Sequence, residues 1–262
     1  MLISFICLSY NQVNIIFNLL NSIARLSIRY EIILIDDGSD DDTVYNVVKK
    51  NIKNIKIIQL KYNTKNQSLC RNLGIKLSSG THTYFIDGDD VLLSNNFDNL
   101  IEYIKDKNVD IYFVPIQHRR VDGTYYITKI ILRDDLELSH APCQYILSKK
   151  FIAKNSIFFD EVKYTFDNED CFIFYLALSK AKKILYLNNF SEITCMIHSI
   201  GNNTYMKFNK DSYPKYLFEL CNCIKNILIK NGKKDLLIFI NNYYFKEMIR
   251  IKRYKINKVL PI

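Results

Sequence analysis

Residues 84–90 read Tyr84-Phe85-Ile86-Asp87-Gly88-Asp89-Asp90, an apolar run that leads directly into three carboxylates around one glycine. The run is too short for a helix and is typical of a buried strand, so the acids should lie at its carboxyl end. Ligands of open α/β sheets bind in the crevice outside such ends. In extended backbone Asp87 and Asp89 project to the same side, and two convergent carboxylates suit a hard divalent cation that also takes phosphate oxygens. For an isolated Asp-x-Asp pair a solvated acidic turn is the simpler interpretation, so the surrounding sequence has to decide.

Strands and helices alternate along the first half of the chain. Apolar runs predict strands at residues 2–8, 31–35, 55–60 and 83–86, and helical periodicity follows each of the first three. This alternation predicts an α/β fold with a mostly parallel sheet and helices on both faces. Three of the four strands end in polar clusters that should share one sheet edge, namely Ser9-Tyr10, Asp36-Asp37 and Asp87-Gly88-Asp89. Such an edge is typical of a cleft for a nucleotide and a metal ion.

Helix boundaries are also predicted in this half. Thr43 can cap the second helix, whose inner face would carry Val44, Val47 and Val48. The third helix spans the pair Arg71-Asn72 and should be closed by Ser79-Gly80.

Composition limits the classes of protein to consider. The chain has 262 residues, 48% of them hydrophobic, and a formal net charge of +9, which indicates a polyanionic partner or an anionic membrane surface. No nucleic-acid-binding motif is found, so nucleic acid is not an expected partner. The seven cysteines have neither framework nor zinc spacing and indicate reduced thiols in a cytoplasmic protein. No apolar run has spanning length, and residues 1–8 are too short for a signal sequence.

These motifs together resemble the inverting glycosyltransferases of the large family 2 group, which have the GT-A fold. The matching pieces are Ser9-Tyr10-Asn11, residues 31–39, Arg71-Asn72-Leu73-Gly74-Ile75, Ser79-Gly80 and residues 85–90. Two departures are visible. The family usually has Asn-x-Gly shortly before the Arg-Asn pair, whereas residues 63–66 read Asn-Thr-Lys-Asn, and the usual glutamine after the first helix is absent near residues 26–27.

The resemblance implies roles at the donor side. Ser9 and Tyr10 belong to a nucleotide-binding motif in which the tyrosine stacks on the base. Asp37 would accept a hydrogen bond from the base, Asp87 would hold the ribose, and Arg71 would approach the donor. The alternatives without a functional role are a core position for Tyr10 and a surface ion pair for Arg71.

The resemblance also implies a metal site and a catalytic base. Asp89 would bind Mn²⁺ or Mg²⁺ across the donor diphosphate, and His198, at the end of a later strand, would complete the metal shell or touch the diphosphate. The base would lie in the Glu169-Asp170 pair, and Asp170 is the favoured member. Acids at a helix start also suit the helix dipole, which would be a purely structural explanation.

The chain is expected to divide into a GT-A domain at residues 1–205 and a helical basic segment at 206–262. Within the domain, residues 1–93 would bind the nucleotide sugar and residues 94–205 would face the acceptor, with a β-hairpin near residues 119–131. Residues 246–258 contain six basic residues and one acid among apolar ones. Such a segment can lie on the inner face of an anionic membrane, and a solvated helix packed on the domain is the alternative.

The expected reaction is metal-dependent, inverting transfer of a sugar from a nucleotide diphosphate donor, UDP by resemblance, to a hydroxyl of a glycan or lipid-linked acceptor. The expected product is a surface polysaccharide or lipopolysaccharide. Three alternatives stay open: a sugar nucleotidyltransferase, a haloacid-dehalogenase-type phosphatase, and a related binding domain without catalysis. The sugar, the linkage and the oligomeric state are not predicted.

Overall fold

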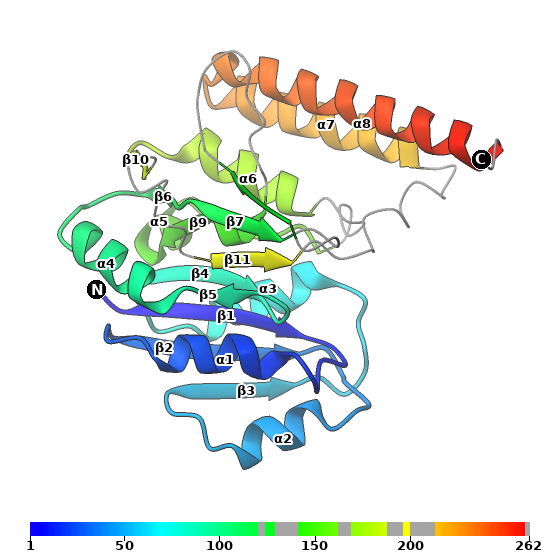
Figure 1. Cartoon of the computed structure of the whole chain (residues 1–262). Coiled ribbons are helices and arrows are strands. Elements are labelled where there is room, and N and C mark those ends of the chain that lie inside the picture. The colour runs from blue at the N-terminus through cyan, green and yellow to red at the C-terminus, as the bar shows by residue number, and fades with distance from the viewer. Residues whose placement is uncertain (120–123, 129–140, 162–168, 188–195, 200–212, 260–262) are drawn as a thin grey trace.

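The computed structural model describes residues 1–119, 124–128, 141–161, 169–187, 196–199 and 213–259 (Figure 1). Its main sheet has seven strands, of which β9 runs antiparallel to its neighbours β4 and β6 while all other adjacent pairs are parallel. The predicted α/β fold with a mostly parallel sheet is therefore confirmed. In spatial order the strands are β10 (Ile184–Tyr186), β6 (Ile111–Phe113), β9 (Tyr145–Ser148), β4 (His82–Asp87), β1 (Ile3–Ser9), β2 (Tyr30–Asp36) and β3 (Ile55–Gln59).

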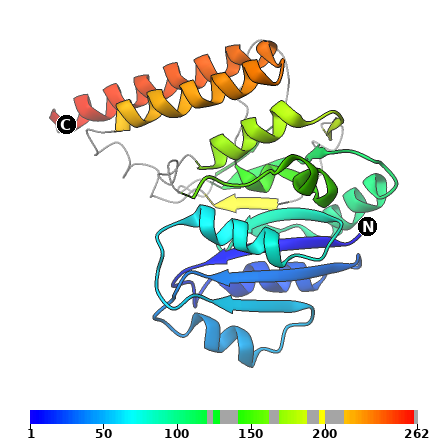
Figure 2. The ribbon, with the colours of Figure 1, turned by 180° about the vertical axis from the view of Figure 1, so that it is seen from behind.

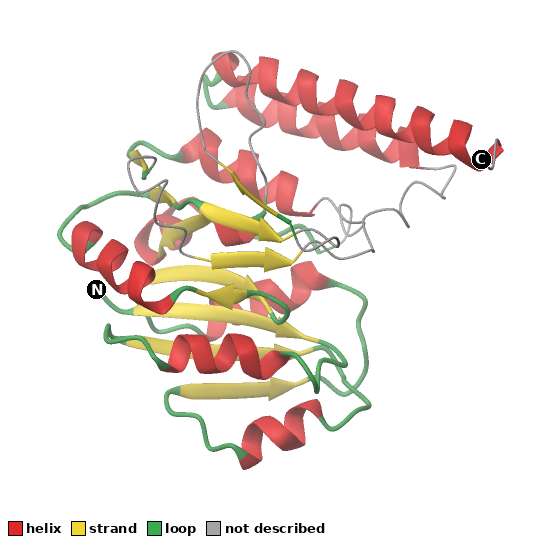
Figure 3. Ribbon diagram, in the orientation of Figure 1, coloured by secondary structure: helices red, strands yellow, loops and turns green. Residues whose placement is uncertain are grey.

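Helices cover both faces of this sheet (Figure 3). Because side chains alternate along a strand, neighbours such as Tyr84 and Phe85 enter different cores. One core contains buried residues of α1 (Ile16–Ala24), α2 (Thr43–Lys49) and α4 (Ser94–Ile104). The other contains buried residues of α3 (Gln67–Leu77), α5 (Lys149–Asn155) and α6 (Glu169–Lys180).

A smaller second sheet has the strand order β5 (Val91–Leu92), β11 (Met196–Ser199), β7 (Ile116–Arg119) and β8 (Tyr125–Thr128). Strands β7 and β8 are antiparallel and pair up to Arg119 with Tyr125, so the predicted hairpin is confirmed, although its turn lies outside the described residues. His198 lies in β11 and is in register with His118 of β7. The side chains of both histidines lie outside the described part, and the metal role predicted for His198 stays a prediction.

The last part of the chain forms an antiparallel helical pair. Helix α7 (Tyr213–Lys230) packs on α6 and α8, and α8 (Leu237–Val259) lies on the outside (Figures 1 and 2). Gly232 separates them with a φ of +70°, which glycine adopts readily. The described residues also include two 3₁₀ turns, η1 (Pro142–Gln144) and η4 (Lys234–Leu236). Among the described helices, none combines the length and apolar character needed to cross a bilayer.

Some local predictions are wrong in detail. The inner face of α2 is formed by Thr43 and Val47, which are four residues apart, whereas Val48 lies about 100° further round the helix and is exposed. Thr43 is the first helical residue, and its hydroxyl accepts from the backbone N–H of Gln12 at 2.9 Å. Helix α3 ends at Ser78 in extended conformation, so Ser79-Gly80 is not its cap.

Candidate active site

The carboxyl ends of β1, β2 and β4 meet at one edge, as predicted. Ser9 is in register with Asp36, and Leu8 with Asp87. The Ser9 hydroxyl donates to Asp36 Oδ2 at 3.1 Å, and Asp36 also accepts from the backbone N–H and the hydroxyl of Ser39 at 2.8 and 2.6 Å. Asp36 is fully buried, so it and Ser9 hold the two strand ends together and leave the following residues at the open edge.

The residues that follow these strand ends point away from the core. Tyr10 is 44% exposed, which rules out the core position considered for it and leaves its ring accessible. Asp37 is half-buried, and its Oδ1 accepts from the backbone N–H of Thr64 at 2.9 Å. Gly38 has a φ of +73°, and a Cβ there would lie 2.3 Å from the carbonyl carbon of Tyr62. The loops after β2 and β3 are thus closely packed around Asp37.

The acidic stretch after β4 is a turn and not extended backbone. The Asp90 N–H donates to the Asp87 carbonyl at 3.0 Å, and the Asp87 N–H donates to Asp90 Oδ2 at 3.2 Å. The argument that Asp87 and Asp89 project to one side as in a strand is therefore wrong. Asp90 is fully buried and stabilises the turn through its bond to the Asp87 N–H, whereas Asp87 and Asp89 are half-buried. A Cβ on Gly88 would lie 2.8 Å from the Leu8 carbonyl oxygen, so the turn is packed against β1.

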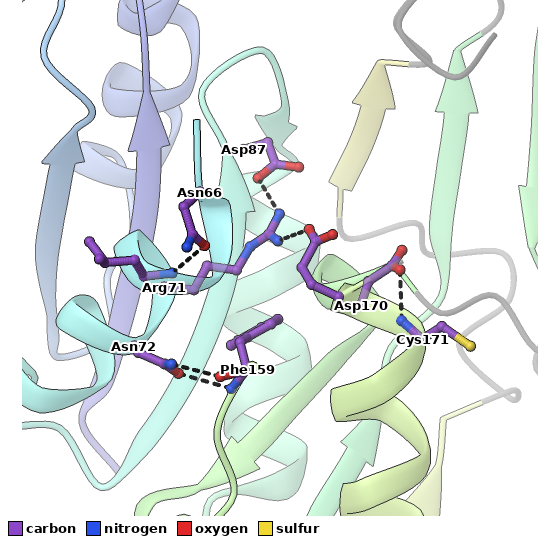
Figure 4. A network of polar contacts seen from close by, with 9 residues as sticks. Asn66, Arg71, Asn72, Asp87, Phe159, Asp170 and Cys171 are labelled. Carbon is purple, nitrogen blue, oxygen red and sulfur yellow. Dashed lines mark hydrogen bonds and ion pairs between the residues drawn. The ribbon is translucent and has the colours of Figure 1, made fainter. Parts of the chain in front are cut away.

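Arg71 connects this turn to helix α6 (Figure 4). Its Nη2 lies 3.2 Å from Asp87 Oδ1 and its Nη1 lies 2.5 Å from Glu169 Oε1. The side chains of Arg71, Asp87 and Glu169 are 3%, 38% and 8% exposed, so the arginine and Glu169 are buried and Asp87 is the accessible member of the three. Burial alone would lower the pKa of Arg71, but the Asp87 and Glu169 carboxylates raise it above its ordinary value, so the guanidinium stays charged.

Helix α3, which carries Arg71, also binds the segment that precedes α6. The Asn72 side chain donates to the Phe159 carbonyl at 2.8 Å and accepts from the Phe159 N–H at 2.9 Å. The Asn66 side chain donates to the Glu161 carbonyl at 2.9 Å, and the Arg71 guanidinium lies 5.3 Å from the centroid of the Phe159 ring. The Arg-Asn motif therefore holds the two halves of the site together. Sequence reasoning had noted this motif but not the roles of Asn66 and Phe159.

The two acids at the start of α6 differ in environment. Glu169 is buried against Arg71, whereas Asp170 is half-buried and its Oδ1 accepts from the Cys171 N–H at 2.6 Å. Figure 4 shows Asp170 beside the Arg71 network, and its negative charge contributes to the raised pKa of Arg71. Of the two acids, Asp170 is the more exposed.

The described residues can hold a divalent cation only with help from a ligand. No group of three or more His, Cys, Asp or Glu side chains gathers in the described ranges. Asp89 places a partly accessible carboxylate at the strand edge, beside the half-buried Asp87. Carboxylate oxygens suit Mg²⁺ or Mn²⁺, which commonly combine one or two carboxylates with phosphate oxygens. The donor set therefore fits a cation shared with a bound diphosphate.

Comparison with known proteins gives a consistent result. The model of the family "Glycosyl transferase family 2" matches residues 4–172. A poly(ribitol-phosphate) β-N-acetylglucosaminyltransferase of Staphylococcus aureus, TarP, is 28% identical over 218 residues, which cover 78% of this chain and 66% of that protein. An Escherichia coli UDP-Glc:α-D-GlcNAc-diphosphoundecaprenol β-1,3-glucosyltransferase, WfaP, is 26% identical over 247 residues, which cover 91% of both chains.

A solved structure supports the same fold. The crystal structure of residues 1–349 of S. aureus TarS in complex with UDP aligns with a TM-score of 0.73 at 22% identity and covers 93% of this chain and 72% of that one. This likeness confirms the expected GT-A fold. The sequence match to full TarS covers only 20% of that protein, and the match to TarP covers just under two thirds of that one.

Proposed function

The chain belongs to glycosyl transferase family 2, and from that premise we propose that it transfers a sugar from a UDP-sugar to a hydroxyl of a lipid-linked or other glycan acceptor, with inversion at the anomeric carbon. The product would be part of a surface polysaccharide or lipopolysaccharide. The observation that supports this proposal is the Arg71 bridge between Asp87 and Glu169, because it joins the turn after β4 to the start of α6, where Asp170 follows Glu169.

Donor binding is supported by the open edge of the sheet. The exposed ring of Tyr10 can stack on a base, and the half-buried Asp37 can accept from a base N–H. Asp87 keeps part of its carboxylate in the cleft while Arg71 holds the rest, which suits a contact to ribose hydroxyls. UDP is proposed as the nucleotide because the aligned TarS structure contains UDP and WfaP is named for UDP-glucose.

A divalent cation, Mn²⁺ or Mg²⁺, would be held by Asp89 together with the diphosphate. When bound, it supplies positive charge that stabilises the departing UDP. His198 stays a candidate second ligand.

The proposed chemistry is a single displacement. Asp170 accepts the proton of the acceptor hydroxyl as that oxygen forms a bond to the anomeric carbon on the face opposite to the leaving UDP. Glu169 is held by Arg71 and acts as a positioning residue that fixes the start of α6. The anomeric carbon passes through an oxocarbenium-like state, and the negative charge of the acids at the start of α6 can stabilise it.

A specific observation favours a lipid-linked acceptor. WfaP, named for a diphosphoundecaprenol-linked acceptor, matches along 91% of both chains, whereas the poly(ribitol-phosphate) enzymes are longer than this chain. We therefore favour a sugar on a polyprenyl diphosphate over a wall polymer.

The test is a panel of UDP-sugars with Mn²⁺ and a short-chain polyprenyl diphosphate sugar, scored for UDP release and for the glycosylated product, with Asp170→Asn as the blank. Transfer from one UDP-sugar supports the proposal. Release of pyrophosphate would indicate a nucleotidyltransferase, and phosphate from a phosphomonoester would indicate a phosphatase. UDP binding without turnover on any donor would indicate a binding domain.

A further inference from the structure

Helix α8 carries an apolar stripe that faces away from the protein. Ile238, Phe245 and Ile249 are separated by seven and four residues, so they lie on one face of the helix. All three are exposed, and Phe245 is 70% accessible. The opposite face buries Ile240 and Glu247 against the rest of the molecule. A row of large exposed apolar side chains on one helix is unusual for a surface that meets only water.

The charge of this helix is almost entirely positive in its last part. Residues 246–258 contain six basic residues, namely Lys246, Arg250, Lys252, Arg253, Lys255 and Lys258. Their one acid is Glu247, which is 1% exposed and therefore withdrawn from the outer surface. The backbone of α8 stays helical to Val259, so the basic residues belong to the same helix as the apolar stripe.

The position of α8 in the fold leaves this face open. Helix α7 lies between α8 and α6, and α8 packs mainly on α7. In both views of the ribbon the carboxyl end of α8 lies on the same side of the molecule as the carboxyl ends of the parallel strands (Figures 1 and 2). A surface that receives α8 would therefore also lie near the end of the sheet that carries the candidate active site.

We propose that the outer face of α8 docks on an anionic lipid bilayer, with Ile238, Phe245 and Ile249 entering the headgroup region and the basic residues contacting lipid phosphates. A helix of this kind lies in the plane of the interface and binds through apolar area together with attraction to anionic lipids. This docking goes beyond sugar transfer and does not depend on the donor or the acceptor.

Two other occupants fit less well. A symmetric dimer through this face would bring the net positive charge of both copies to one interface, where like charges repel. Nucleic acid would satisfy the positive charge but offers no place to bury the Phe245 and Ile249 side chains.

The experiment is flotation of the full chain with vesicles of phosphatidylethanolamine and phosphatidylglycerol, compared with vesicles of phosphatidylcholine alone. The double variant Phe245→Glu with Ile249→Glu removes the stripe without touching buried positions. The matched control is Tyr45→Glu with Val48→Glu, which places two acids on exposed apolar positions of α2, far from α8 in the chain. UDP binding is measured for all three proteins to check that they are folded.

Wild type and the α2 control should float with the anionic vesicles and much less with phosphatidylcholine, and binding should weaken with salt. The α8 variant should bind at least about tenfold more weakly. Equal flotation of the α8 variant and wild type, or no flotation of wild type, would overturn the proposal. So would a wild-type dimer in light scattering that the α8 variant converts to monomer while vesicle binding is unchanged, because the face would then join two copies.

Discussion

Nη1 of Arg71 lies 2.5 Å from Oε1 of Glu169, and this contact joins helix α3 to the first residue of helix α6. Both side chains are buried, so removing the cation would leave the Glu169 carboxylate without its partner. We expect Arg71→Met to lower the free energy of unfolding by about 3–5 kcal/mol. Urea unfolding measures this loss.

The control for that change is Arg25→Met, because Arg25 is exposed at the end of α1. Its effect should stay within about 0.5 kcal/mol. A loss below about 1 kcal/mol for Arg71→Met would show that the bridge does not hold the two halves of the site together.

Variants of Asp89 and Asp90 should distinguish a loss of metal binding from a loss of stability. We expect EDTA to abolish transfer, and Asp89→Asn to weaken UDP binding at least about tenfold in Mn²⁺ but little in EDTA. Asp90 is buried and accepts from the Asp87 N–H, so Asp90→Asn should cost about 1–3 kcal/mol of stability while UDP binding still responds to Mn²⁺. Calorimetric titration of UDP with and without the metal measures both variants. Undiminished transfer in chelator would remove the metal from the mechanism.

Lys65 lies in the segment Asn63-Thr64-Lys65-Asn66, which lacks the glycine expected from the family resemblance. It has a φ of +53°, and its N–H donates to the Asn63 side chain at 2.7 Å, so the loop keeps a left-handed conformation without glycine. We expect Lys65→Gly to be more stable than Lys65→Ala by about 1 kcal/mol, because only glycine adopts this φ without strain. Thermal or urea unfolding compares the two. An alanine variant as stable as the glycine variant would contradict this explanation.

Several strands of the main sheet could be predicted from the local hydrophobic pattern of the sequence. The apolar runs at 31–35 and 83–86 identify β2 and β4 to within one residue at each end. They could be found because a strand buried on both faces appears as a continuous apolar run. The meeting of the strand ends follows from parallel pairing alone. The insertion of β9 between β4 and β6 could not be predicted, because this pairing joins segments far apart in the chain.

The site could be predicted less completely. Arg71 stands among helical residues whose periodicity does not distinguish an exposed charge from a buried one, and its partner Glu169 lies 98 residues away. The adjacent acids Asp36 and Asp37 look alike in sequence, yet only Asp36 is fully buried, because Ser9 and Ser39 supply its donors. Periodicity reports which face is apolar and not where a distant partner lies.

His82 should make stability depend on pH in a defined window. Burial, with a contribution from the positive N-terminus, lowers the pKa of His82 from 6.5 to about 4. The folded state therefore favours the neutral ring, and its contribution to stability is present above pH 6.5 and is lost as the pH falls toward 4. The slope in this window should be at most about 1.4 kcal/mol per pH unit.

The comparison is with His82→Gln, which cannot titrate there. Urea unfolding at several pH values should show a steeper fall for wild type than for the variant between pH 6.5 and 4. Glu31, whose pKa is lowered below 4.5 by hydrogen bonds from Ser4, Ser79 and Gly80, also loses stabilisation at the acidic end of this window, but both proteins carry it, so its effect cancels in the comparison. Parallel curves for the two proteins would show that His82 is protonated freely in the folded state.

Asp170 is expected to act as the base, and its neighbour provides the control. Asp170 is half-buried and accepts from the Cys171 N–H, which the side-chain oxygen of an asparagine can also do, so Asp170→Asn should change stability and UDP affinity little while turnover falls by about 10²–10⁴-fold. Glu169→Gln keeps Asp170 but weakens the contact to Arg71, so stability should fall by about 1–3 kcal/mol and turnover should fall less than in Asp170→Asn. Turnover, UDP affinity and urea unfolding are measured for both variants side by side. Near-normal turnover in Asp170→Asn with an inactive but stable Glu169→Gln would exchange the two roles, because a positioning residue that is removed should show its loss in stability first.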